Sequence, residues 1–206
     1  MHISDGVLPT SVTLVSYVLT FAGASWSLRK VQAEDLPRIA VVTSSFFVAS
    51  LIHIPFGPTS VHLLLPGIVG ALLGPAAFLS ITLGLFLQSI LFQFGGLTAL
   101  GANAVMMGLP AVLCGLLFRM LRGKTLKTHI LAGGLAGGLG TLLSAVILAV
   151  FLFAAGDDFV GVAKLAVVAH LPVVVIEAGI SAFIISFLFR VKPELLRSGH
   201  FLRHDK

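Results

Sequence analysis

Long uninterrupted apolar runs are the feature that most constrains the fold of this chain. Hydrophobic residues make up 57% of the 206 positions, the mean hydropathy is +1.09, and only 10% of the residues are charged. A soluble domain usually carries about a quarter charged residues, and one bilayer crossing takes about 20 apolar residues. Because the runs are apolar on all sides and lack strand-like alternation, helices are the expected spanning structure. The sequence therefore predicts an all-α membrane protein.

Seven apolar segments are predicted to be transmembrane helices. The third is short and interrupted by glycines, and Gly74-Pro75 forms a tight turn into the fourth. We expect a single transmembrane domain over residues 1–206 that ends in a basic tail at about 191–206. The predicted helices cover residues 11–29, 38–54, 63–74, 76–94, 99–121, 129–155 and 162–190.

The basic residues predict the orientation of these helices. With seven spans, 12 of the 13 Lys and Arg residues fall on one side, and Lys164 is the exception. Because cytoplasmic loops carry an excess of Lys and Arg, that side is expected to be the cytoplasm. The N-terminus is then outside and the C-terminus inside a bacterial or archaeal cytoplasmic membrane. The net charge of +5 reflects this topology, and no nucleic-acid binding is expected.

The first two residues, Met1 and His2, form a candidate metal chelate. No secretory signal pattern is present at the start of the sequence, so the Met1 amine is expected to survive. That amine, the backbone nitrogen of His2 and its imidazole can close two small rings on one ion. The three nitrogens lie in a plane and leave a fourth position open. A planar nitrogen set favours nickel(II) or copper(II).

A second histidine on the same outward side is predicted to supply the fourth ligand. The loop that runs from His53 to His62 precedes a glycine-interrupted helix, where irregular backbone must be buried in protein or line a cavity. His62 is therefore the expected ligand, whereas His53 is expected to lie at the membrane interface. Thr59 and Ser60 are candidates to orient the His62 ring through its second nitrogen.

Four further polar residues have both a functional and a structural interpretation. Asp5, next to Gly6, either belongs to a turn that folds the terminus into the bundle or caps the first helix at a frayed end. Asn103 either bridges two helices or holds a group beside the metal. His170 and Glu177 lie two turns apart on one helix face. They are a proton relay, a second metal stop, a gate, or a pair that fixes the helix register.

Several stretches resemble the CbiM/NikM proteins, which are the metal-binding membrane subunits, or S components, of energy-coupling factor transporters for cobalt and nickel. The resemblance runs over essentially the whole chain in the right order. It implies a seven-helix subunit whose N-terminus enters the bundle, with the metal bound by Met1, His2 and His62. The matching stretches are Met-His-Ile-Ser-Asp-Gly-Val-Leu-Pro from residue 1, Gly-Pro-Thr-Ser-Val-His-Leu from 57, Gly-Gly-Leu-Thr-Ala-Leu-Gly-Ala-Asn from 95 with Met-Met-Gly from 106, and His-Leu-Pro-Val-Val-Val-Ile-Glu from 170.

The resemblance also implies partners and a cargo. Family members are not enzymes; they work with a transmembrane coupling (T) subunit, a dimer of ATP-hydrolysing subunits and often a small accessory membrane subunit. This sequence has no GxxxxGK[ST] motif for ATP. We expect Co²⁺ as the transported ion, with Ni²⁺ bound at least as well by the isolated site. After Asn103 the chain reads Ala-Val-Met-Met, where the family often has a second Asn or a Phe-Asn pair, so the groups around the ligands differ.

Four alternatives remain open at this point. The first is a nickel-specific importer of the same family, and the second is a stand-alone proton-coupled transporter or channel that uses His170 and Glu177. The third is an intramembrane enzyme whose zinc is held by His62, His170 and Glu177. The fourth is a purely structural membrane subunit, which leaves the Met-His start unexplained. The absence of an HExxH or similar helical pair argues against the enzyme.

Overall fold

Helices form almost all of the structure. The computed structural model describes residues 2–56 and 59–196, and from His53 to His62 it describes the backbone alone. The last ten residues of the predicted basic tail, 197–206, lie outside this range. The elements are α1 (Thr10–Leu28), α2 (Leu36–Ser50), β1 (His53–Phe56), β2 (Thr59–His62), α3 (Pro66–Leu73), α4 (Ala77–Phe92), α5 (Leu100–Leu121), α6 (Leu126–Ala155) and α7 (Val160–Val191), with 3-10 turns η1 (Ala33–Asp35), η2 (Gly74–Ala76), η3 (Asp157–Phe159) and η4 (Pro193–Leu196).

Each predicted apolar segment contains one of these α-helices, and the all-helical membrane class is confirmed. Most helix ends fall within three residues of prediction; α2 ends earlier, at Ser50. In the described part of the chain, five segments are long and apolar enough to cross a membrane, and α3 with α4 counts as one of them. At 1.5 Å per residue, the eight residues of α3 cover only about 12 Å of a hydrocarbon core of about 30 Å. By length, neither α2 nor α3 alone counts as a membrane crossing, so the structure does not show the predicted seven spans.

Polar and apolar side chains of helix α1 are distributed in the reverse of a soluble protein's pattern: its hydroxyl side chains face inward and its large apolar side chains face outward. The hydroxyl of Thr20 donates to the carbonyl of Gly101 at 2.8 Å, while Phe21 beside it is 69% exposed. Small polar residues at helix contacts and large apolar residues outside are typical of packing within lipid. The buried residues of α1 are Ser16, Thr20 and Ser27.

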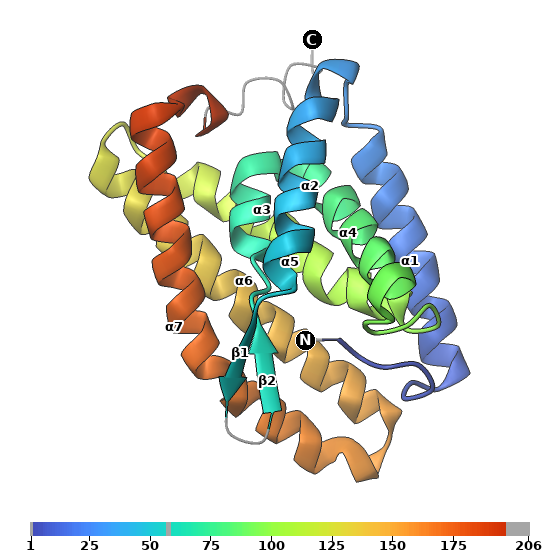
Figure 1. Cartoon of the computed structure of the whole chain (residues 1–206). Coiled ribbons are helices and arrows are strands. Elements are labelled where there is room, and N and C mark those ends of the chain that lie inside the picture. The colour runs from blue at the N-terminus through green and yellow to red at the C-terminus, as the bar shows by residue number, and fades with distance from the viewer. Residues whose placement is uncertain (1, 57–58, 197–206) are drawn as a thin grey trace.

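The short helix α3 lies at the centre of the bundle, with α1 and α7 at opposite sides of it (Figure 1). Glycines allow this position. A Cβ on Gly67 would lie 2.0 Å from the carbonyl oxygen of Ala136 in α6, and one on Gly70 would lie 1.8 Å from that of Ala111 in α5. Helix α3 is therefore wedged between α5 and α6, and its Gly-rich sequence serves close packing.

The glycine pairs of α6 also serve internal packing. A Cβ on Gly137 would lie 2.3 Å from the hydroxyl oxygen of Ser181, and one on Gly133 would lie 2.6 Å from Cγ1 of Ile185. Both neighbours belong to α7. The close approach that small-xxx-small spacing permits is thus made between α6 and α7.

A β-hairpin joins α2 to α3, and the pattern of the sequence does not predict it. Strands β1 and β2 are antiparallel, and His53 lies opposite His62 in the register. Figure 1 shows the hairpin extending from the ends of α2 and α3 at one end of the bundle. The two loop histidines are consequently adjacent across the ladder.

A basic side chain, Arg38, connects three elements at the other end of the bundle. The Arg38 guanidinium, near the start of α2, donates to the carbonyls of Leu72 in α3 and Leu195 in η4. A cation at the carboxyl end of α3 complements the partial negative charge of the helix dipole there. The first turn of α2, the last turn of α3 and the segment after α7 therefore meet at one end.

Candidate metal centre

The segment that precedes α1 folds back into the bundle (Figure 1). The backbone N–H of Ile3 donates to Oδ1 of Asn103 at 2.9 Å, and Nδ2 of Asn103 donates to the Ile3 carbonyl at 3.0 Å. Ile3 itself is 3% exposed and belongs to the hydrophobic core. The Asn103 side chain thus pairs with the backbone of Ile3 as a neighbouring strand would. It fixes the residue that follows His2.

Asp5 fixes the same segment at a second point. Its Oδ1 accepts hydrogen bonds from the backbone N–H of Thr98 at 2.9 Å, the Thr98 hydroxyl at 2.6 Å and the N–H of Ala99 at 3.2 Å. The bond from the Thr98 hydroxyl is the main reason that the pKa of Asp5 is lowered. Gly6 makes the turn with a φ of 79°. Helix α1 begins after Pro9 without a side-chain cap, so Asp5 bonds at the start of α5 instead of capping α1.

Two glycines make room for this segment in the loop before α5. Gly95 and Gly96 both have a φ of +77°, which L-residues rarely adopt. A Cβ on Gly96 would lie 2.1 Å from Cγ of Asp5, and one on Gly95 would lie 3.2 Å from Cβ of His2. The predicted glycine-rich stretch is therefore the surface against which the N-terminal segment lies.

The His2 imidazole is oriented by a chain of hydrogen bonds across α4 and α2. Nε2 of His2 lies 2.9 Å from Oε1 of Gln88, and Nε2 of Gln88 donates to the Ser50 hydroxyl oxygen at 2.7 Å. The Ser50 hydroxyl in turn donates to the Phe47 carbonyl at 2.7 Å. Because the Gln88 amide nitrogen is used toward Ser50, its carbonyl oxygen faces His2. Nε2 of His2 therefore carries a proton, and in the neutral ring the lone pair is on Nδ1.

This tautomer is the one that the predicted chelate requires. Nδ1 of His2 can close a six-membered ring through a metal to the residue's own backbone nitrogen, whereas Nε2 is too far along the ring. Ligating histidines usually donate their other N–H to an oxygen that fixes tautomer and orientation. Gln88 supplies that oxygen, and the ring of Phe94 stacks beside His2 with centroids 6.1 Å apart.

The structure brings three predicted residues of the site together: His2, Asp5 and Asn103. Met1 lies outside the described residues, as do the side chains of His62 and Ser60. Within the described part of the chain, no three His, Cys, Asp or Glu side chains gather in a metal-binding group. The predicted chelate takes only the His2 side chain from that part, because its other donors are an amine, a backbone nitrogen and His62.

Glu177 is fully buried and bonds to the chain that follows the hairpin. Its carboxylate accepts from the backbone N–H groups of Leu64 and Leu65 and from the hydroxyl of Thr141 in α6. His170 is also buried, and its Nδ1 lies 2.6 Å from the Ala166 carbonyl oxygen. Two helical turns separate His170 from Glu177 by about 10 Å along the axis, which is too far for a direct hydrogen bond. The carboxylate therefore connects α7 to α6 and to the backbone between the hairpin and α3.

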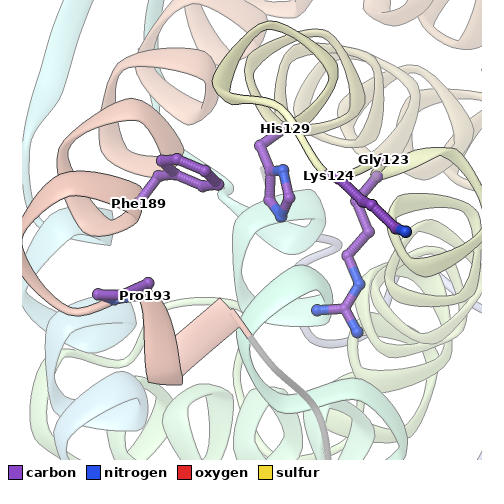
Figure 2. A pocket seen from close by; sticks show the side chains of 6 residues that line it. Gly123, Lys124, His129, Phe189 and Pro193 are labelled. Atoms are coloured by element: carbon purple, nitrogen blue, oxygen red, sulfur yellow. The ribbon is translucent and has the colours of Figure 1, made fainter.

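A histidine-containing pocket at the basic end differs in character. It has a volume of about 480 Å³, and in it His129 packs against Phe189 with ring centroids 4.7 Å apart (Figure 2). Arg122 and Lys124 also line it, and their positive charges oppose binding of a divalent cation. The remaining lining residues are Gly123 and Pro193.

Known proteins resemble this chain over nearly its full length. A Haemophilus influenzae protein named as a metal transport protein is 38% identical over 203 residues, covering 95% of this chain and 97% of the relative. The fused nickel transport protein NikMN of Rhodobacter capsulatus is 31% identical, and the match covers 95% of this chain and 64% of the relative. A Methanocorpusculum labreanum protein named as cobalt transport protein CbiM 2 is 32% identical, covering 96% of this chain and 92% of the relative.

A solved structure and a family profile agree with these relatives. The structure, described as that of a truncated transition metal transporter, is 25% identical, has a TM-score of 0.71, and covers 93% of this chain and 99% of that one. Residues 2–195 match the family described as "CbiM: Cobalt uptake substrate-specific transmembrane region". The chain therefore belongs to the CbiM family, whose members are multi-pass membrane components of cobalt and nickel uptake and not enzymes.

Proposed function

We propose that this chain is the metal-binding S component of an ATP-driven energy-coupling factor importer, with Co²⁺ as its biological substrate and Ni²⁺ bound at least as tightly. The ion is held by the amine of Met1, the backbone nitrogen and Nδ1 of His2, and the imidazole of His62. The observation that carries this proposal is the orientation of His2 by Gln88 inside a docked N-terminal segment. Relatives named for nickel and for cobalt support either ion as cargo.

Binding exchanges protons for the metal. The amine and the imidazole must be unprotonated, and the ion displaces the proton of the His2 amide nitrogen. The resulting plane of nitrogens suits Ni²⁺, whereas Co²⁺ binds the same donors more weakly. Asn103 bonds Ile3, and Asp5 bonds the loop before α5, so the backbone next to His2 is held in place before the ion arrives.

A hollow beside the segment supplies an approach route. It has a volume of about 510 Å³ and is lined by Ser4, Asp5, Ser89, Ile90, Gln93, Gly95, Gly96 and Leu97. Because the pKa of Asp5 is lowered, its carboxylate is ionised at neutral pH and attracts cations toward the site.

The partners that we propose are a transmembrane coupling subunit, a dimer of ATP-binding subunits and a small accessory membrane subunit. Release of the ion inward requires these partners, because a closed nitrogen chelate is too tight to empty spontaneously. This chain covers 64% of the fused relative from Rhodobacter capsulatus, which supports an accessory component beside it. The ATP-hydrolysing work is assigned to other chains.

A comparison of metal binding by calorimetry tests the ligand set. Purified protein with its native start is titrated with Ni²⁺ and with Co²⁺, beside a variant with one glycine added before Met1. The added residue removes the amine from the chelate, so tight binding should be lost. One glycine added at the carboxyl end is the matched control and should change nothing. Unchanged binding after the N-terminal addition contradicts the chelate.

The hairpin register provides a second matched pair. His62→Ala should weaken binding because it removes the fourth nitrogen, whereas His53→Ala, across the ladder, should not. Equal losses in the two variants would contradict the assignment of His62 as the hairpin's one ligand.

A further inference from the structure

We propose that Glu177 is a positioning residue for the metal site: its carboxylate fixes the backbone that follows β2, and thereby places the His62 imidazole for coordination. The inference rests on the proposed function and adds to it the residue that holds the fourth ligand in position.

Both oxygens of the Glu177 carboxylate accept hydrogen bonds at this point. Oε1 of Glu177 accepts from the N–H of Leu64 and lies 3.1 Å from the nitrogen of Leu65, while Oε2 lies 3.0 Å from that same nitrogen. The Thr141 hydroxyl donates to Oε2. His62 stands two residues before Leu64, so these bonds restrain the strand that carries it.

The backbone at this point needs such a restraint. Leu65 has φ 51° and ψ 24°, a left-handed conformation, although it is not glycine and it precedes Pro66. Strained backbone persists only where its surroundings over-determine it, and it gathers at ligand clamps. Helix α3 has no side-chain cap of its own. The carboxyl oxygens of Glu177 instead accept hydrogen bonds from the N–H groups of Leu64 and Leu65 just before α3.

The location of Glu177 suits a link between elements far apart in sequence. Helix α7 packs chiefly against α6, and Thr141 belongs to α6. One buried carboxylate thus connects α6, α7 and the two residues that lead from the hairpin into α3. A change in how α7 lies on α6 would therefore act on the backbone two residues after His62.

A double-mutant cycle tests the inference. Ni²⁺ binding is measured by calorimetry and by the visible ligand-field absorption, whose position depends on the number of nitrogen donors. Glu177→Gln should weaken binding about 10- to 100-fold, the loss that is typical when a residue that supports a metal ligand is replaced. Its absorption band should move to that of His62→Ala. In the double variant the two losses should not add, because both act on the same ligand.

Two further variants complete the design. Thr141→Val removes one donor to the carboxylate and should shift affinity and band in the same direction by less. Ser80→Ala removes a buried hydroxyl that bonds with Thr43, and it should leave both the affinity and the band unchanged. If Glu177→Gln fails to fold, judged by circular dichroism, Thr141→Val carries the same cycle with His62→Ala.

Additive losses, or a wild-type absorption band in Glu177→Gln, would overturn the inference while leaving the proposed ligands intact. An unchanged affinity and band in His62→Ala would instead contradict the proposed function, and the inference with it.

Discussion

At the scale of single residues, candidate ligands are easier to find in the sequence than the residues that hold them in place. Met1 and His2 stand out as candidates because the proposed chelate is contiguous, and Asn103 stands out as a polar residue within an apolar helix. Gln88 was missed, although it is the one carboxamide in the apolar run of α4. Nothing local indicates that it faces a residue 86 positions earlier. That pairing is a property of the fold.

Replacement of Gln88 measures what this partner contributes. Gln88→Leu keeps a side chain of similar size but removes the oxygen that fixes the His2 ring. We expect Ni²⁺ affinity, measured by calorimetry, to fall about 10- to 100-fold. The matched control is Thr43→Val, which breaks a buried hydrogen bond between α2 and α4 at 2.7 Å without touching His2. Equal affinities in Gln88→Leu and wild type would mean that the ring is oriented without this bond.

The pH dependence of binding counts the protons that the metal displaces. Below the ordinary pKa of an α-amine, about 7.7–8.0, the amine and the amide nitrogen each release one proton, so affinity should fall about 100-fold per pH unit. A slope of only tenfold would exclude the amide nitrogen as a ligand. Titrations between pH 8 and pH 6.5, about the window set by these ordinary values, measure the slope.

Asp5 does not account for this loss. The pKa of Asp5 is lowered from the ordinary 3.8, so its carboxylate stabilises the docked segment fully above that pH. This stabilisation is lost only as the pH falls through the lowered pKa. Asp5→Asn should therefore leave the slope between pH 8 and pH 6.5 unchanged.

At the scale of elements, helices were predictable and the hairpin was not. Apolar runs locate α1, α4 and α5 within two residues, because lipid requires each helix to satisfy its own backbone. The hairpin consists of two four-residue strands with prolines in and beside them, so period-2 alternation does not mark the strands. The dipeptide Gly57-Pro58 indicates a turn, but it does not show that strands lie on either side of it. The sequence signal for helix α3 is weak because the segment is short and Gly-rich, yet those glycines allow it to pack at the centre of the bundle.

The loop before α5 gives the prediction at this scale. Gly96→Ala should cost backbone strain at a φ of +77° and should also push Asp5 away, since the new Cβ would lie 2.1 Å from its Cγ. Gly156→Ala is the matched control: its φ is +133°, but nothing lies within 4 Å of a Cβ there. Both variants should lose thermal stability, and Gly96→Ala alone should also lose Ni²⁺ affinity. Equal affinities in the two variants would show that the docked segment does not depend on Gly96.

At the scale of the whole molecule, polarity runs in two directions. Across the bundle, hydroxyls and small residues face inward and large apolar side chains face lipid. Along the bundle, the N-terminal segment and the hairpin lie toward one end, while Arg38 joins α2, α3 and η4 at the other. Composition indicated the first direction, and basic residues indicated the second. Which end faces the cytoplasm depends on the membrane, and is therefore a prediction.

Accessibility of introduced cysteines tests that orientation. Cys114, the one cysteine in the sequence, is 1% exposed and should react little with a membrane-impermeant maleimide. Asp158→Cys and Lys124→Cys place exposed thiols beyond opposite ends of α6, whose 30 residues extend about 45 Å and can cross the bilayer with tilt. With the metal site outside, Asp158→Cys should be labelled in intact cells and Lys124→Cys only after permeabilisation. The reverse pattern would place the N-terminal chelate in the cytoplasm and contradict an importer that captures its ion from outside.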